Sequence, residues 1–218
     1  MSNGAHGAVG RPRSTSHAEI EAAAFALFKA QGFEETTVED IADEVGIGRR
    51  TLFRYFRSKN DIPWGQFDAG LAGFRAQLFA AADDVPVLDA VHGAVVEFNR
   101  LDPEAVGQHR QRMALIMNTP SLQAHSALRY EEWRAVVCDY VAHRYGLEPW
   151  DLLPRTVGHV SLALSLSAYE QWLLDEDSDL LELLRATKPV LLGYVMDGVG
   201  PAGEVGARAL GRRARGRS

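Results

Sequence analysis

The chain has 218 residues, 46% of them hydrophobic, and a formal net charge of −6 with a pI near 5.6. This length allows a large core in one domain or in two unequal ones. The single cysteine, Cys138, excludes an intrachain disulfide and fits a reducing compartment. No secretory signal is recognisable, and the longest segment without charged side chains, residues 156–169, is shorter than the roughly 20 apolar residues of a membrane-spanning helix. We therefore expect a cytoplasmic protein with no membrane partner.

Charge is distributed unevenly along the chain. Residues 1–60 are neutral overall, residues 61–206 carry a net charge of −11, and residues 207–218 carry +5. Residues 46–60, GIGRRTLFRYFRSKN, contain five cations and no acid. An acidic body repels phosphate, so any contact with nucleic acid has to be confined to such a basic block. The Arg-rich C-terminus could add nonspecific DNA affinity, but a solubilising tail is the simpler interpretation.

Three short helices are expected in the first sixty residues. Ser16 with Glu19, and Thr37 with Asp40, have the spacing of capping boxes, and a glycine ends each of these two helices. After the tight turn GIG, residues 49–56 form a third helix. Two short helices joined by such a turn and packed on a longer first helix make a helix-turn-helix unit.

The third helix carries most of the basic block. Leu52 and Phe56 are four residues apart and form its inward face. The residues that project outward are Arg49, Arg50, Thr51, Phe53, Arg54 and Tyr55. A solvated charge run is the usual alternative, but the position on the second helix of a helix-turn-helix favours entry into a DNA major groove.

The rest of the chain has an all-helical pattern. A fourth helix, capped by Ser58 with Asp61, is expected to run to about residue 82. Further helices are expected near 87–100, 103–118, 121–145, 150–175 and 179–198, with Pro189 kinking or splitting the last one. The expected division is a disordered N-terminal arm at 1–13, a DNA-binding domain at 14–75, a helical ligand-binding and dimerisation domain at 76–200, and a disordered basic tail at 201–218.

The segment FKAQGFEETTVEDIADEVGIGRRTLFRYFRSKNDI resembles the TetR family of bacterial transcriptional regulators. Within that family, FRYFRSKNDIPWGQFD, HRQRM and LQAHSALRYEEWRAVV are similar to the regulators associated with mycofactocin biosynthesis genes. The resemblance implies an all-α fold, with a three-helix DNA-binding domain and a larger C-terminal helical domain. It also places six residues on positions that contact DNA in the family: Thr37, Arg50, Thr51, Arg54, Tyr55 and Lys59.

The chain departs from the family pattern at two positions of the third helix. Gly48 stands where many members have a Ser or Thr cap, so the capping hydrogen bond is lost, at a cost of a few tenths of a kcal/mol. Phe53 stands where many have a phosphate-binding Tyr, so it can offer only apolar contact. Lys59, at the start of the fourth helix, suits a backbone phosphate.

The last two helices are apolar on almost every face, which a helix exposed to water cannot be. They could be buried centrally in one chain, but pairing with a second copy across a two-fold axis is the simpler solution. We therefore expect a homodimer.

The middle helices offer a candidate effector site. Large apolar side chains and scarce cations occur there at helical spacing: Phe98, Arg110, Met113, Met117, Arg129, Tyr130, Trp133 and Val137. By composition alone an ordinary core explains the apolar members, but the resemblance implies that small molecules bind inside this domain. Arg110 and Arg129, with Arg112 and Arg134, could meet an anionic head group, although surface ion pairs with the many acids are the better explanation for each residue taken alone.

These observations predict a DNA-binding repressor that binds a palindromic double-stranded operator as a homodimer and is released by a hydrophobic small molecule. A long-chain acyl-CoA is the best candidate effector, and the fourth helix the expected lever between effector and DNA. A helical lipid carrier or an enzyme domain is the alternative. No catalytic motif, metal-ligand cluster or cofactor motif occurs in the sequence, so we expect neither an enzyme nor a cofactor.

Overall fold

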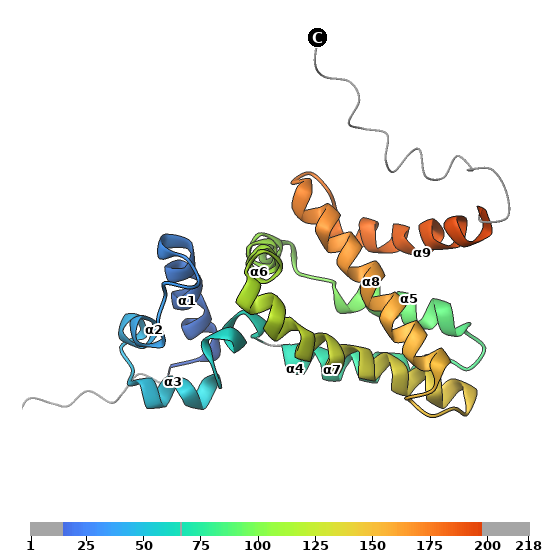
Figure 1. Ribbon diagram of the computed structural model, residues 1–218, viewed down its shortest axis with the longest axis horizontal. Helices are drawn as coiled ribbons and strands as arrows, with labels where there is room; N and C mark the ends of the chain where they lie inside the picture. Colours follow the sequence, from blue (N-terminus) through green and yellow to red (C-terminus); the bar gives the residue numbers. More distant parts are fainter. Residues whose placement is uncertain (1–14, 66, 198–218) are drawn as a thin grey trace, which may run out of the picture. The chain divides into compact units, whose positions relative to one another are not determined.

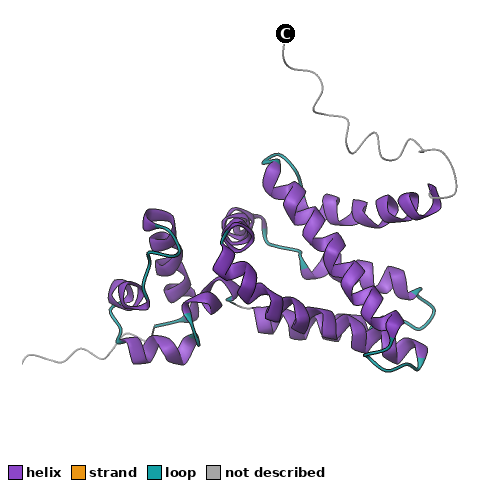
Figure 2. Ribbon diagram, viewed as in Figure 1, coloured by secondary structure: helices purple, strands orange, loops and turns teal. Residues whose placement is uncertain are grey.

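The structure is a computed structural model that describes residues 15–65 and 67–197. These residues form helices and connecting loops without a strand, as Figure 2 shows, so the all-α prediction is confirmed. The chain divides into two compact units, residues 1–65 and residues 66–218. This division lies ten residues before the expected one at 75/76. The expected N-terminal arm and basic tail lie outside the described residues.

Unit 1 contains α1 (His17–Gln31), α2 (Val38–Val45), α3 (Arg49–Tyr55) and the 3-10 helix η1 (Lys59–Trp64) (Figure 1). Both expected capping boxes are present, since the Ser16 hydroxyl accepts from the Glu19 N–H and the Thr37 hydroxyl from the Asp40 N–H. The backbone N–H of Thr37 in turn donates to the Asp40 carboxylate and holds the pKa of that carboxyl below its ordinary value. The ends of α1 and α2 are therefore fixed by local sequence.

The core of unit 1 joins its helices through fully buried side chains. Ile20 of α1, Ile41 of α2, Leu52 of α3 and Ile62 of η1 are 0% exposed, and Phe56 is buried next to α3 as expected. Gly48 precedes α3 without a side-chain capping bond, as the sequence indicated. Helix α3 is thus held by its apolar inward face rather than by a capping side chain.

Lys59 ties η1 to the loop between α1 and α2. Its ammonium donates to the carbonyls of Phe33 at 2.6 Å, Thr36 at 2.8 Å and Glu34 at 3.3 Å, and it lies 4.3 Å from the centre of the Phe33 ring. The side chain of Thr36, itself buried, donates to the Gly32 carbonyl. An ammonium group has three N–H donors, so these carbonyls can occupy all of them.

Unit 2 is built from longer helices. They are α4 (Phe67–Phe79), α5 (Val87–Phe98), the 3-10 helix η2 (Pro103–Ala105), α6 (Val106–Asn118), α7 (Pro120–Tyr145), α8 (Leu152–Leu174) and α9 (Leu180–Asp197). Helix α7 packs against α4, α6 and α8, and α9 packs against α5 and α8 (Figure 1). Gly158 of α8 allows a close crossing with α7, because a Cβ there would lie 2.9 Å from the sulfur of Cys138.

The prediction of one continuous fourth helix capped by Ser58 was wrong. The continuous fourth helix is instead η1 followed by α4, with Gly65 between them at a φ of 37°. Pro63 inside η1 and this left-handed glycine interrupt α-helical hydrogen bonding. Ser58 does not cap the backbone, since its hydroxyl donates to Asp61 instead. Pro189, expected to kink or split the last helix, lies within an unsplit α9.

A chain of hydrogen bonds crosses the interior of unit 2. The Asn99 amide donates to the Val95 carbonyl, and the buried Tyr169 hydroxyl donates to the Asn99 oxygen at 2.6 Å. Since that hydroxyl proton is used, Tyr169 accepts from Nε2 of His109, 2.8 Å away. Burial, assisted by the charge of Arg112, lowers the pKa of His109 to about 4. This network joins α6 and α8 to the end of α5.

Replacing Lys59 by alanine should loosen unit 1. The Phe33 and Thr36 carbonyls would lose their donor, so we expect the free energy of unfolding of unit 1 to fall by about 1–3 kcal/mol. Hydrogen exchange in the full chain should show faster exchange across residues 32–37, whereas Lys29→Ala, at an exposed lysine of α1, should not change it. Unchanged exchange, together with a weaker salt dependence of DNA binding, would show that Lys59 acts on phosphate instead.

The stability of unit 2 should depend on the protonation of His109. Between pH 6.5 and about 4 the unfolded chain binds a proton at this histidine that the folded chain does not. The free energy of unfolding should therefore fall with decreasing pH in this window, by up to about 3 kcal/mol. Urea titrations should give a flatter profile for His109→Gln than for the wild type, with His159→Gln as an exposed control. Parallel profiles for wild type and His109→Gln would contradict the assignment.

Candidate DNA-contact surface and effector cavities

The outward face of α3 presents unpaired positive charge. Arg50 and Arg54 are exposed and make no ion pair with any described residue of the chain. Arg49 is also exposed, but it pairs with Glu39 of α2 at 2.7 Å and lies 5.4 Å from the centre of the Phe53 ring. Because an exposed ion pair of this kind is weak, it leaves Arg49 able to exchange Glu39 for another anion.

The remaining residues of this face have different environments. Phe53 is 39% exposed, Thr51 is half-buried, and Thr37 is exposed but uses its hydroxyl to cap α2. Tyr55, which the sequence left open between packing and contact, donates its hydroxyl to the Thr15 carbonyl at 2.6 Å and packs edge-on against the ring of His17. Tyr55 therefore connects α3 to the start of α1.

Lys59 is the predicted DNA residue whose environment differs most from expectation. The sequence placed it at a helix N-terminus facing a phosphate, but η1 is a short 3-10 helix and the ammonium is bound to three loop carbonyls. The structure thus gives Lys59 a positioning role, since it holds the segments that frame α3. Local sequence could not indicate this role, because the carbonyls that Lys59 binds belong to residues 23–26 positions earlier in the chain.

Four of the eight predicted effector residues pack in the interior of unit 2. Trp133 is 4% exposed and stacks on Phe74 at 5.1 Å between ring centres, and Phe98 packs on the same Phe74 ring. Val137 and Met113 are also buried. These four residues contribute to the packing of unit 2, and their role in effector binding stays a prediction.

Arg110 caps the C-terminal end of α8. Its guanidinium donates to the carbonyl of Trp172 and, at 3.3–3.5 Å, to those of Asp175, Glu176 and Ser178, and it lies 4.2 Å from the centre of the Trp172 ring. The last carbonyls of a helix lack partners within the helix and attract cations. Arg110 therefore stabilises α8 through backbone carbonyls, which are neither the anionic head group nor the surface acids that the sequence left open as its partners.

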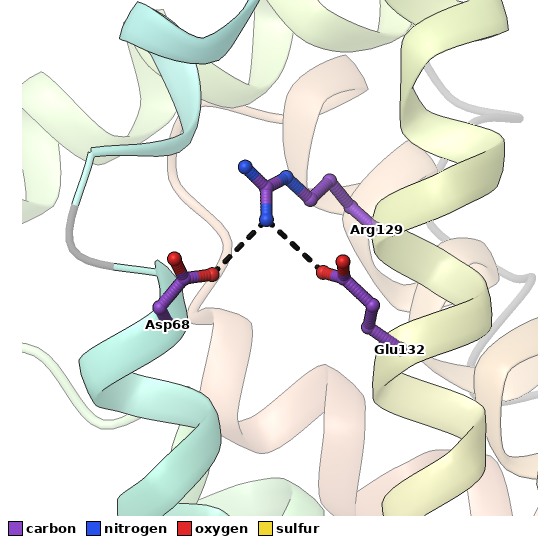
Figure 3. A network of polar contacts seen from close by, with 3 residues as sticks. All are labelled: Asp68, Arg129 and Glu132. Carbon is purple, nitrogen blue, oxygen red and sulfur yellow. Dashed lines mark hydrogen bonds and ion pairs between the residues drawn. The ribbon is translucent and has the colours of Figure 1, made fainter. Parts of the chain in front are cut away.

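Arg129 lies between two carboxylates. One guanidinium nitrogen is 3.0 Å from Asp68 of α4 and 3.0 Å from Glu132 of α7, as Figure 3 shows. The arginine side chain is only 18% exposed, while Asp68 is largely exposed. An anionic ligand would have to displace both acids, so the structure disfavours the expected head-group role of Arg129 as well.

Met117 and Tyr130, also predicted effector residues, line a cavity. It has a volume of about 180 Å³, lies between α6, α7 and α8, and is also bordered by Ser126, Leu166 and Glu170. Burial raises the pKa of the Tyr130 hydroxyl above its ordinary value. The described lining includes an acid but no lysine or arginine, so this cavity does not favour an anionic ligand.

A second cavity, of about 170 Å³, was not anticipated from the sequence. It lies between α5, α8 and α9, and its apolar walls include Val91, Val95, Leu164 and Leu191, with Lys188 also lining it. The sequence signal was present, because α8 and α9 are apolar on nearly all sides. That signal was interpreted as a dimer surface or as central burial in one chain, and not as the wall of a cavity.

No group of three or more His, Cys, Asp or Glu side chains within residues 15–65 and 67–197 could hold a metal ion. In the same part of the chain, no helix is both long and apolar enough to cross a membrane. Cys138 is half-buried, and burial followed by the charge of Asp139 raises the pKa of its thiol, as expected for an unreactive cysteine.

A segment of each unit matches a known protein family. Residues 20–62 match the family described as bacterial regulatory proteins, tetR family, and residues 85–193 match the MftR C-terminal domain of the TetR group. A Mycobacterium tuberculosis protein named as a mycofactocin biosynthesis transcriptional regulator, MftR, is 44% identical over 183 residues. The alignment covers 84% of this chain and 92% of that protein.

Solved structures support the same fold. FadR from Bacillus halodurans, described as a fatty acid degradation regulator, aligns with a TM-score of 0.59 at 17% identity, over 82% of this chain and 98% of that one. FadR from Thermus thermophilus, a TetR-family repressor in complex with lauroyl-CoA, aligns with a TM-score of 0.53 at 20% identity, over 82% and 94%.

The helix-turn-helix of unit 1, the helical unit 2 and the extended match to MftR agree with one another. They identify a transcriptional regulator and not an enzyme. The chain belongs to the TetR family of bacterial transcriptional regulators and carries an MftR-type C-terminal domain.

Proposed function

We propose that this protein is a homodimeric repressor that reads a palindromic operator with α3 and is released from it by a long-chain acyl-CoA. The observation that carries the DNA-binding part is the face of α3, where exposed Arg50 and Arg54 have no acidic partner among the described residues. Arginine binds guanine through two hydrogen bonds in the major groove, and the acidic remainder of the chain confines DNA to this face.

The dimer is supported by apolar side chains that the single chain leaves in water. On α9, Tyr194 is 79% exposed, Val195 60% and Met196 72%, and on α8 Leu152 is 84% and Leu174 67% exposed. Exposed apolar surface on adjoining helices is typical of a protein interface, and a second copy presents the same surface across a two-fold axis. Two copies of α3 would then meet two half-sites.

Fewer residues support an acyl-CoA effector than the sequence suggested. Arg110 and Arg129 have internal partners, so they no longer support an anionic head group. The support that remains is the pair of cavities in unit 2 and the lauroyl-CoA bound to the structurally similar Thermus thermophilus FadR. Each buried methylene of an acyl chain contributes roughly 0.8 kcal/mol.

Replacing Arg54 by alanine should weaken operator binding and relax base preference. The loss of one arginine–guanine contact costs about 1–3 kcal/mol per half-site. Fluorescence anisotropy with DNA from upstream of the protein's own gene, at fixed salt, measures the effect. Lys29→Ala removes the same charge from α1 and serves as the matched control. Equal affinity and base preference for Arg54→Ala and wild type would refute the assignment of α3.

The dimer is best disrupted on α9. Leu164 and Leu166 of α8 are partly buried and line cavities, so arginine at either position could prevent folding. Tyr194→Arg places a charge on the exposed face and should give monomers with weakened operator binding. Light scattering at micromolar concentration provides the test, with exposed Arg185→Ala as a control on the same helix. A monomeric wild type would rule out the proposed dimer.

Lauroyl-CoA should release the wild-type protein from its operator. Release requires that the ligand bind the DNA-free conformation more tightly than the DNA-bound one. Titration into the labelled protein–operator complex, with free coenzyme A as the control, measures the release. If no chain length lowers the anisotropy, acyl-CoA is not the effector.

A further inference from the structure

The cavity between α5, α8 and α9 has an uneven distribution of polar groups. Its walls are mainly Val and Leu side chains, and Lys188 is the one lysine or arginine among the described lining residues, which include no acid. The Lys188 ammonium pairs with Asp89 of α5, and Nε2 of His92 donates to the Leu184 carbonyl at 3.0 Å. The cavity is thus apolar along most of its wall and has one ammonium group, that of Lys188, in its lining.

Lys188 can exchange its partner at small cost. Asp89 is 45% exposed and Lys188 28% exposed, so their ion pair is partly solvated and contributes little. An anionic head group at the same position would replace one negative partner by another. The cavity between α6, α7 and α8 lacks this feature, because Glu170 lines it and would repel such a group.

The size of the cavity limits what it can hold without rearrangement. Its volume of about 170 Å³ is comparable to the engineered apolar cavity of about 150 Å³ that binds benzene, so it accommodates about six carbons. A longer chain has to separate the helices that enclose it. Helix α9 is the most readily displaced, because Pro189 removes one backbone hydrogen bond from its middle.

We propose that the hydrocarbon chain of an anionic acyl ligand enters between α5, α8 and α9, that Lys188 turns from Asp89 to its head group, and that chains longer than the cavity displace α9. This inference rests on the proposed function. It adds the location of the site and a dependence of release on chain length. Since α9 also carries exposed apolar side chains of the proposed dimer surface, its displacement alters that surface directly.

Binding of an acyl-CoA to the protein and release of the operator should depend differently on the length of the acyl chain. Hexanoyl-CoA should bind, as measured by calorimetry, but leave the operator complex intact. Lauroyl-CoA should bind and release the operator. Hexanoyl-CoA in excess should therefore compete with lauroyl-CoA and preserve the complex. Release by hexanoyl-CoA at the occupancy at which lauroyl-CoA acts would overturn the size argument.

Cavity-filling variants locate the site. Val91→Phe fills this cavity from α5, outside the proposed dimer surface, and Met117→Phe fills the cavity between α6, α7 and α8. For each variant the lauroyl-CoA concentration that releases half of its own operator complex is compared with the wild type. Val91→Phe should raise this concentration at least tenfold and Met117→Phe less than threefold. The reverse order would overturn the inference.

Lys188→Met tests the head-group contact. It should raise the half-release concentration for lauroyl-CoA severalfold, whereas Arg185→Met, at an exposed arginine of the same helix, should not. Laurate measured in parallel distinguishes a carboxylate from the phosphates of coenzyme A as the partner of Lys188. Equal half-release concentrations for Lys188→Met and wild type with both ligands would contradict the contact.

Photocrosslinking of the wild-type protein keeps the test independent of variant folding. A lauroyl-CoA analogue with a diazirine at the chain end should label peptides that contain residues 88–95 or 187–192. Labelling confined to residues 116–130 would place the chain in the other cavity. If lauroyl-CoA neither binds nor releases the wild type, the proposed function itself fails, which is a different outcome from a misplaced site.

Discussion

The apolar surface that α8 and α9 leave uncovered is the constraint on which the rest of the molecule depends. Tyr194, Val195 and Met196 project from the last helix into water, and burying them requires another surface. In the proposed homodimer a second copy of the chain would supply that surface by symmetry and would also bring a second α3 to the DNA. The burial of this C-terminal apolar surface would thus also pair the two DNA-binding units of the proposed dimer.

The polar contacts of unit 2 hold the helices around this surface. Arg110 neutralises the carbonyl end of α8, and the chain from His109 through Tyr169 to Asn99 fixes α6 and α8 to α5. On the other side of the unit, the Lys188–Asp89 ion pair and the hydrogen bond from His92 to the Leu184 carbonyl connect α9 to α5.

Local sequence was enough to predict the parts of the fold that depend on neighbouring residues. The capping boxes at Ser16 and Thr37 and the inward pair Leu52 and Phe56 placed α1, α2 and α3 correctly. The break after η1 was also encoded locally, by Pro63 and Gly65, but the apolar pattern on both sides was interpreted as one helix.

The effector site could not be predicted in the same way, because core and cavity residues have the same composition. Trp133 is core only because Phe74, from another helix, stacks on it. Arg110 and Arg129 each have a partner more than sixty residues away in sequence, the Trp172 carbonyl and Asp68, and such pairings cannot be read from local spacing. Lys188 was overlooked, although it is the cation that lines an apolar cavity.

The distance between the two α3 helices tests the central claim most directly. Spin labels at Glu44→Cys, on the exposed face of α2, in a Cys138→Ser background report this distance by pulsed electron resonance. Bound to its operator, the protein should give one narrow distance distribution, since two half-sites in successive major grooves lie about 34–36 Å apart. Lauroyl-CoA should shift or broaden this distribution, while hexanoyl-CoA should not. No intermolecular coupling at all, or the same distribution with and without lauroyl-CoA, would contradict a dimer whose DNA-reading geometry the ligand controls.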